Sequence, residues 1–335
     1  ALGMTANGAE GNTRAQMEQM MHTDTAVLND YLKAYTDYMP NSEACQVNIA
    51  NSIWFRDRDS LAINEDFLKT SRNYYDASIF EAPFDAGTRD DINSWVKKET
   101  NGMIQKLLEE APPRDAVMYL VNALSFDGEW RDIYKKNQIH KGTFNAENGE
   151  HQSAEFMYST EAVYLENTLG RGFLKPYGDG AYAFAAVLPD EGMTMKEFLE
   201  RLKENGITDL LEQTRNKTVC VRLPKFTVEY NVVLNESLTE SGMKDAFDSQ
   251  KADFSSMAHS DNDNIYISKV IHKTKIDVDE KGTKAGAVTA VEVSEGSAVQ
   301  TEEPKEVFLD RPFFYMIIDT RQNFPLFMGC LMQLE

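Results

Sequence analysis

The sequence predicts an α+β fold, because helical patterns dominate its early part and strand patterns dominate its C-terminal half. A regular alternation of strands and helices, which would indicate a parallel α/β sheet, is not present. The length of 335 residues alone would allow two domains. Since no internal repeat, low-complexity block or linker divides the chain, we expect a single domain over residues 1–335.

The first elements follow from apolar spacing. Apolar residues recur at helical spacing over residues 27–39, and Pro40 stops this helix. Alternating apolar residues over 47–55 then predict a strand with one buried face.

A second long helix is expected before the strand-rich half. Thr88, with Asp91 three residues on, resembles a capping box, and the helix that it begins is expected to continue to Leu108. Buried strands are predicted for the apolar runs that follow. These runs are residues 117–126, 181–188, 219–223, 265–278, 313–318 and 325–332.

The charge balance limits the classes of partner. The chain has 34 Lys+Arg against 54 Asp+Glu, a formal charge of −20. Nucleic acids and anionic membranes are bound through clustered Lys and Arg, so neither is expected as a partner. The three cysteines, Cys45, Cys220 and Cys330, are too few and too far apart to indicate a disulfide framework or a zinc motif.

Sequence motifs of common enzymes are missing. The chain has no G-x-S-x-G elbow, P-loop, dinucleotide fingerprint or H-E-x-x-H pattern. Residues 261–264 resemble a calcium loop only faintly, because Tyr266 stands where such a loop needs glycine. We therefore expect no enzymatic activity, no catalytic residues, no cofactor and no metal site.

The most informative segment is 279–304, where nearly every residue from Gly282 to Ala290 is small. Residues of one parity are small or apolar throughout, whereas the other parity carries Lys284 and Glu292; a period of two is typical of a strand. The first set is Thr283, Ala285, Ala287, Thr289, Val291 and Val293. Three glycines nevertheless weaken a permanent strand. The pattern alone leaves open a surface loop, an edge strand or a segment that switches between loop and sheet.

A longer stretch, residues 270–290, resembles the hinge region of an inhibitory serpin. Other segments match the same family in its own order along the chain. They are GAEGNT at 8–13, the W-V, T-x-G-x-I and L-L pattern within 84–108, NALSFDGEW at 122–130, LPKF at 223–226, GMKDAF at 242–247, DRPF at 310–313 and LFMG at 326–329. Family members usually start about forty residues earlier, so we expect that first segment to be missing here.

The resemblance implies three β-sheets with surrounding helices and an exposed reactive-centre loop at about 283–304. A target protease would attack this loop and form an acyl-enzyme. The cleaved loop would then enter the largest sheet as a new strand and trap the protease. The family pattern assigns the hinge of the loop to Glu280, Gly282, Thr283, Ala285, Gly286 and Ala287, the shutter beneath the sheet to Asn122 and His272, and the breach at its top to Trp130.

Family spacing, counted from Glu280, places the scissile bond at Gly296–Ser297. From Ala285 to Pro304 the loop contains no Lys, Arg, aromatic, Leu or Met residue, which disfavours trypsin-like and chymotrypsin-like targets. We expect an elastase-like serine protease as the covalent partner. A Glu-specific protease acting at Glu295, or a cysteine protease, is the alternative.

Two other functions stay open on the sequence. A non-inhibitory serpin that acts as a carrier or binding module is disfavoured by the small residues from Ala285 to Ala290, and an enzyme of another type by the missing motifs. Gly286 departs from the usual family alanine and is expected to slow insertion. The resemblance implies an extracellular or cell-surface monomer that is capable of polymerisation.

Overall fold

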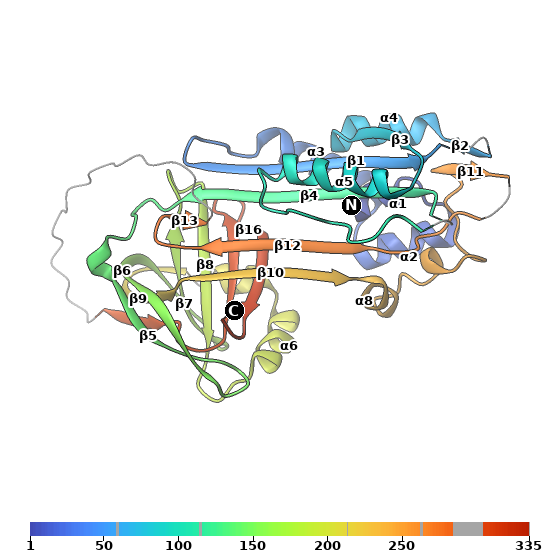
Figure 1. Ribbon diagram of the computed structural model, residues 1–335. Coiled ribbons are helices and arrows are strands. Elements are labelled where there is room, and N and C mark those ends of the chain that lie inside the picture. The colour runs from blue at the N-terminus through green and yellow to red at the C-terminus, as the bar shows by residue number, and fades with distance from the viewer. Residues whose placement is uncertain (58–59, 114–115, 213, 262–263, 284–303, 335) are drawn as a thin grey trace. The chain divides into compact units, whose positions relative to one another are not determined.

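The computed structural model describes residues 1–57, 60–113, 116–212, 214–261, 264–283 and 304–334 (Figure 1). The chain divides into two compact units. The first comprises Ala1–Pro40, Val47–Ser125 and Glu229–Lys275, and the second comprises Asn41–Gln46, Phe126–Val228 and Ile276–Glu335. This division does not test the prediction of a single domain, because both units are assembled from interleaved segments of the chain.

The helices belong mainly to the first unit. They are α1 (Leu2–Ala6), α2 (Gly11–Met21), α3 (Thr25–Tyr38), α4 (Glu65–Tyr75), α5 (Ala86–Glu99), α6 (Met195–Asn205), α7 (Ile207–Glu212) and α8 (Asn235–Glu240), with single 3-10 turns at η1 (Lys136–Gln138) and η2 (Asp245–Phe247). The helix predicted over 27–39 is confirmed as α3.

The strands form three sheets, which confirms the α+β fold class. They are β1 (Cys45–Arg56), β2 (Leu61–Ile63), β3 (Ser78–Ala82), β4 (Met118–Glu129), β5 (Ile139–Asn145), β6 (His151–Glu166), β7 (Gly170–Pro176), β8 (Tyr182–Pro189), β9 (Thr214–Pro224), β10 (Phe226–Val233), β11 (Ala258–Ser260), β12 (Ile271–Val278), β13 (Gly282–Thr283), β14 (Lys305–Phe308), β15 (Phe313–Asp319) and β16 (Phe324–Leu331). A six-stranded sheet has the order β10-β12-β13-β4-β1-β3, and β11 pairs with β2. An eight-stranded sheet has the order β14-β9-β6-β7-β8-β15-β16, with β5 added on β6.

Both faces of β1 are covered, which corrects the prediction of a half-buried strand at 47–55. Four consecutive residues, Asn51 to Trp54, are buried. Ile53 packs in a cluster with residues of α1, α2 and α4, whereas Trp54 packs with Ile92 and Val96 of α5. The alternation therefore reflects two different apolar clusters, one on each face of the sheet.

Helix α5 starts earlier and ends earlier than the sequence pattern indicated. Its capping box joins Asp85 and Thr88, so Thr88 is the third helical residue and not the N-cap. The helix ends at Glu99 because Asn101 and Gly102 adopt left-handed φ angles of 49° and 75°. The apolar residues up to Leu108 continue the buried cluster without continuing the helix.

The run 265–278 contains a shorter strand than predicted, because β12 begins only at Ile271. The preceding backbone bonds to other segments: Ile267 N donates to Ala246 O, and Val270 N donates to the Asn235 side chain. The other predicted strands are confirmed as β4, β8, β9, β15 and β16.

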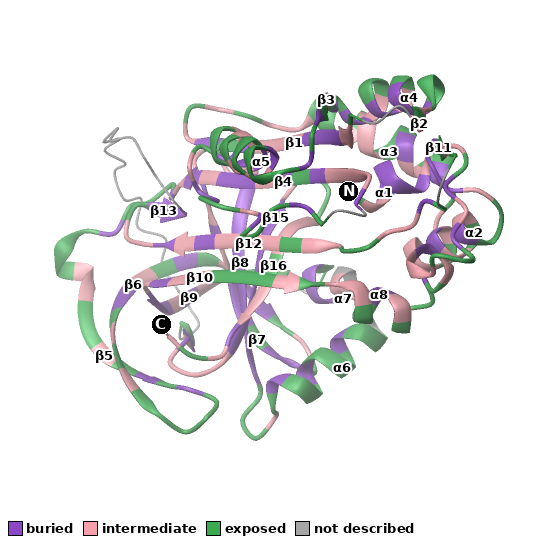
Figure 2. Ribbon diagram, turned by 45° about the vertical axis from the view of Figure 1, so that its right-hand side comes forward, coloured by how far each residue is buried: buried purple, intermediate pink, exposed green. Residues whose placement is uncertain are grey.

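The second unit is organised around β8, in which all eight residues are buried (Figure 2). Its side chains pack with those of β15 and of α6 and α7, for example Val187 with Phe198 and Met316. This strand lies between β7 and β15 in the eight-stranded sheet. The neighbouring strand β7 pairs with β8 and leads into Tyr177, a residue of the candidate site.

The side chain of Asn93, in α5, hydrogen-bonds to the backbone of the non-helical segment that follows the helix. Its side chain accepts hydrogen bonds from Leu107 N and Leu108 N and donates to Leu108 O, all at 2.8 Å. Substitution Asn93→Ala should lower the free energy of unfolding by about 1–3 kcal/mol, since partly buried backbone groups lose their partners. Urea unfolding measures this loss, and Asn148→Ala in an exposed turn is the control. Equal stability of the two variants would contradict the role of Asn93.

Candidate functional site

The site begins at the tight turn that joins β12 to β13. Asp279 N donates to Gly282 O at 3.0 Å, and the Asp279 carboxylate accepts from Lys281 N at 2.7 Å and Gly282 N at 3.1 Å. A side-chain oxygen that binds the backbone two residues on stabilises such a turn. Residues 279–282 are called the hinge turn below, because they include Glu280 and Gly282 of the predicted hinge.

The described part of β13, Gly282–Thr283, lies between the longer strands β12 and β4 (Figure 1). It is antiparallel to both: Thr283 pairs with Val278 of β12 and with Gly128 of β4, and Gly282 pairs with Glu129. A Cβ on Gly282 would lie 2.0 Å from Gly128 O, so only glycine allows this approach. Gly282 is therefore required here by close packing rather than by a positive φ.

Donors from Trp130 and Tyr134 hold three successive carbonyls of the hinge turn. The indole Nε1 of Trp130 donates to Asp279 O at 2.8 Å, and its backbone N donates to Lys281 O at 2.8 Å. The backbone N of Tyr134 donates to Glu280 O at 3.0 Å. Trp130 and Tyr134 are called the clamp below. Both are buried, so these bonds are shielded from competing water.

Tyr177 connects the clamp to Thr283, the first residue of the predicted inserted face. The Trp130 and Tyr177 rings stack with centroids 4.4 Å apart, and Tyr177 Oη lies 2.5 Å from Thr283 Oγ1. Burial raises the pKa of Tyr177 well above its ordinary value, so its hydroxyl stays protonated. Thr283 is 1% exposed, as predicted for the inward-facing set.

The Glu280 carboxylate is bridged to Lys225 of the LPKF segment. Lys225 Nζ lies 2.8 Å from Glu280 and 3.0 Å from Glu155. Hydrogen bonding from Lys225 lowers the pKa of Glu280. Burial would lower the pKa of Lys225, but hydrogen bonds to the two carboxylates outweigh burial and raise it. Through Lys225, the side chain of Glu280 in the hinge turn is thus connected to Glu155 of β6.

The predicted shutter residues lie in the first unit, on β4 and β12. Asn122 Nδ2 donates to Asn51 Oδ1 at 2.9 Å, and Asn51 Nδ2 donates to Tyr75 O at 2.7 Å. In the described part of the chain, no hydrogen bond joins Asn122 to His272. Both residues are exposed, although partial burial lowers the pKa of the His272 imidazole. This shift favours the neutral form of the imidazole.

Several residues of the site could not be identified from the sequence. Tyr134 and Tyr177 carry no motif, and only the stacking and backbone contacts reveal them. Lys225 was recognised only as part of LPKF, not as the partner of Glu280. The predicted Ala285, Gly286, Ala287, Glu295, Gly296 and Ser297 lie outside the described residues.

The described residues contain no cluster of His, Cys, Asp or Glu suited to a metal ion. Within the same residues, none of the helices combines the length and the apolar character needed to cross a bilayer.

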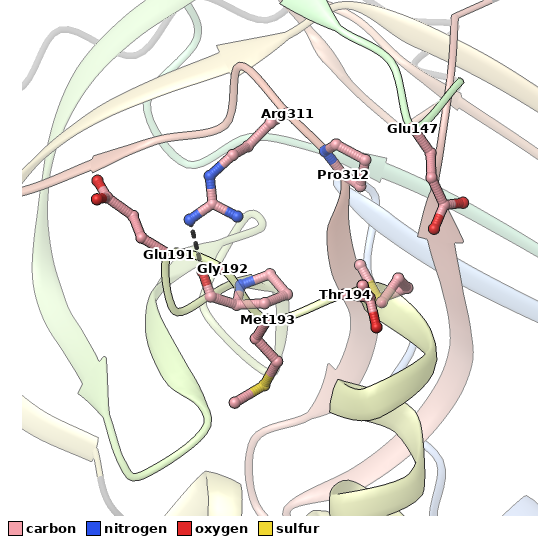
Figure 3. A pocket seen from close by; sticks show the side chains of 9 residues that line it. Glu147, Glu191, Gly192, Met193, Thr194, Arg311 and Pro312 are labelled. Carbon is pink, nitrogen blue, oxygen red and sulfur yellow. Dashed lines mark hydrogen bonds between the residues drawn. The ribbon is translucent and has the colours of Figure 1, made fainter. Parts of the chain in front are cut away.

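A separate pocket of about 420 Å³ lies beside α6 in the second unit (Figure 3). One wall is formed by Arg311, whose Nη2 donates to Pro189 O at 2.5 Å. Glu147 and Glu191 contribute the opposite charge. Because the guanidinium already serves the backbone and the lining mixes both signs, the pocket indicates no class of ligand.

Comparison with known proteins gives consistent results. The family model described as Serpin (serine protease inhibitor) matches residues 1–334. An uncharacterized serpin-like protein of Methanosarcina mazei is 30% identical over 339 residues, 98% of this chain and 78% of that protein. Leukocyte elastase inhibitor of Xenopus tropicalis is 30% identical over 344 residues, 98% of this chain and 89% of that protein.

Solved structures agree with this assignment. The thermophilic serpin tengpin in its native state has a TM-score of 0.92 and 44% identity, covering 99% of this chain and 86% of that chain. Tengpin in its latent state has a TM-score of 0.87 and 43% identity, covering 100% and 89%.

The Lys225–Glu280 bridge should respond to acid. Because the pKa of Glu280 is lowered in the folded protein, its stabilising contribution is complete above the pKa of an ordinary glutamate and is lost as pH falls through the folded pKa. Wild type should exceed Glu280→Gln in thermal stability by less than about 1 kcal/mol near neutral pH, and the difference should vanish below about pH 4. Thermal unfolding between pH 3 and pH 8, with Glu200→Gln as control, measures it. A difference that grows in acid would refute the bridge.

Proposed function

The chain belongs to the serpin family, and from this premise we propose that it is a suicide-type inhibitor of serine proteases that traps the acyl-enzyme by inserting its cleaved loop into the six-stranded sheet. The observation that carries the proposal is β13. Its described residues, Gly282 and Thr283, pair with β4, and Thr283 also pairs with β12, so the segment that follows them begins between two long strands. A longer strand at this position would gain hydrogen-bond partners on both sides.

The register of β13 supports insertion of the following segment. If the pairing continues, Ala285 lies opposite Phe126 and Ile276, which are both buried. Thr289 then lies opposite both Asn122 and His272. Residues directly opposite one another share a face of the sheet, so a small hydroxyl side chain would meet these two polar groups. The proposed register would thus give the predicted shutter residues a common partner.

New backbone hydrogen bonds would make insertion of the loop energetically favourable. Each inserted residue would add a net backbone hydrogen bond of roughly 0.5–1.5 kcal/mol, so about a dozen residues give on the order of 10 kcal/mol. From Thr283 to Gly296 the inserted strand would extend about 45 Å at ~3.3 Å per residue. A protease attached at its end would be carried that far, and distortion of its active site would stall deacylation.

The target is proposed to be elastase-like, with cleavage at or near Gly296–Ser297. The loop composition supports this, and so does the name of the Xenopus relative, leukocyte elastase inhibitor, at 30% identity. Small residues suit a shallow primary specificity pocket. Glu295 keeps a Glu-specific protease as the second candidate. An extracellular or cell-surface location and a monomer that can polymerise stay predictions.

A panel of elastase-like, Glu-specific, trypsin-like and chymotrypsin-like proteases tests this target. We expect a covalent adduct, resistant to SDS, with elastase, and mass spectrometry should place the cut within 292–300. Cuts exclusively outside this range would sink the assignment of the scissile bond. Adducts with trypsin but not elastase would overturn the proposed target, and cleavage of the loop without adduct by every protease would overturn inhibition.

The parity of the loop provides a matched pair of variants. Ala285→Arg places a charge on the inward face, where burial without a partner is costly. It should turn the inhibitor into a substrate, with at least about tenfold fewer adducts per cleavage. Lys284→Arg changes the outward face and should leave adduct formation unchanged. Equal adduct yields from the two variants would show that this segment does not insert with the proposed register.

A further inference from the structure

The second unit contains a buried ion pair that lies outside the predicted hinge, shutter and breach residues. Lys175 Nζ of β7 lies 2.9 Å from Glu161 Oε1 of β6, and the two side chains are 1% and 7% exposed. Removing two charges from water costs several kcal/mol per ion, roughly, and apolar residues of similar volume are often at least as stabilising. Stability alone therefore gives little reason for an ion pair at this position.

The lysine of the pair lies against the clamp. Lys175 Nζ is 4.4 Å from the ring centroid of Tyr134 and 5.4 Å from that of Trp130. It also contacts the carbonyl of Asp132, between the two clamp residues, at 3.4 Å. One ammonium group thus contacts both ends and the middle of the 130–134 segment. Cation–π contacts are strong when desolvated, and they favour a cation over the ring face.

Glu161 of the ion pair is connected to Tyr134 of the clamp through the hydroxyl of Ser159. Glu161 Oε1 accepts from Ser159 Oγ at 2.6 Å, and Ser159 Oγ lies 3.2 Å from Tyr134 Oη. Burial, and then the charge of Glu161, raise the pKa of Tyr134, so its hydroxyl stays protonated and available to donate. The Tyr134 ring is therefore held on its face by Lys175 and at its hydroxyl through Ser159.

The clamp contacts both the ion pair and the hinge turn. The same residues that contact the ion pair donate the three hydrogen bonds to Asp279 O, Glu280 O and Lys281 O. Hydrogen bonds weaken steeply when the donor angle is lost. An apolar replacement for the pair would fill the space, but it would not fix the orientation of the rings and of the backbone between them.

We propose that the Lys175–Glu161 ion pair positions the clamp: it holds Trp130 and Tyr134 in the orientation that retains the hinge turn, and thereby controls how readily the loop begins to insert. Lys175 and Glu161 are positioning residues that act through the clamp. The control of insertion rests on the proposed inhibitory function, whereas the retention of the hinge turn does not.

The test is made on the uncleaved full chain, so that it does not depend on any protease. The double variant Lys175→Met with Glu161→Gln removes both charges at similar volume and leaves no unpaired buried charge. We expect the amides of Trp130 and Tyr134 to exchange with deuterium about tenfold faster or more, while the amides of β15 keep their protection. The tryptophan emission should change as Trp130 gains freedom.

A matched control uses another shielded lysine. Lys273 is 8% exposed and pairs with Glu229 at 2.8 Å. The variant Lys273→Met with Glu229→Gln removes the same charges from the other unit and should leave exchange at Trp130 and Tyr134 unchanged. Equal acceleration in both double variants would indicate general loosening and would overturn the positioning role.

A single substitution tests the same proposal if the double variant does not fold. Tyr134→Phe retains the ring and the backbone donor but loses the link to Ser159 and Glu161. It should accelerate exchange at the Tyr134 amide severalfold, about half of the double-variant effect on a logarithmic scale. Unchanged protection at Trp130 and Tyr134 in the folded variants overturns the proposal.

Inhibition gives a second and separate readout. With a protease that wild type traps, the Lys175→Met, Glu161→Gln variant should lose its inhibitory activity on warming severalfold faster than wild type. A changed exchange rate with unchanged inhibition would limit the ion pair to holding the turn and overturn its control of insertion. If wild type traps no protease at all, the proposed function fails, and the exchange data still decide whether the pair positions the clamp.

Discussion

The site depends on hydrogen bonds to three successive backbone carbonyls just after the end of β12. Asp279, Glu280 and Lys281 present their carbonyls to donors from Trp130 and Tyr134. Buried backbone acceptors must be satisfied, and here one short segment satisfies three in succession. Because the turn is fixed in this way, Gly282 packs against the backbone of Gly128, and the Thr283 hydroxyl lies within hydrogen-bond distance of the Tyr177 hydroxyl.

This arrangement combines a turn held by several hydrogen bonds with a strand that has a partner on each side. Aromatic residues and the Lys225–Glu280 ion pair contact the turn, and the described residues of β13 pair with both of its longer neighbours. Under the proposed function, the residues after Thr283 would extend this strand after cleavage, and the hydrogen bonds formed then would supply the free energy of the change. That is the physical requirement for an inhibitor whose conformational change follows cleavage.

Local signals in the sequence predicted the elements better than their boundaries. Pro40 and the apolar spacing located α3, and continuous apolar runs located the central strands β4, β8 and β15. The end of α5 was missed, because the apolar pattern continues to Leu108 while the backbone turns at Asn101 and Gly102. Periodicity reports which side chains are buried, and a loop packed on its own helix gives the same signal as a longer helix.

The sequence by itself determined the family and the fold class, since these depend on motifs distributed along the chain, and it predicted the place of the hinge from the parity of small residues from Thr283 onward. The tertiary structure alone identified Tyr134 as a partner of the hinge turn, and Tyr177, Lys175 and Glu161 as residues that contact the clamp directly or through Ser159. These residues come from distant segments, and no local pattern records which backbone carbonyl a side chain or amide will face after folding. Contacts between segments remote in the chain are decided by packing, because a hydrogen bond depends on positions and angles that only the assembled sheets fix.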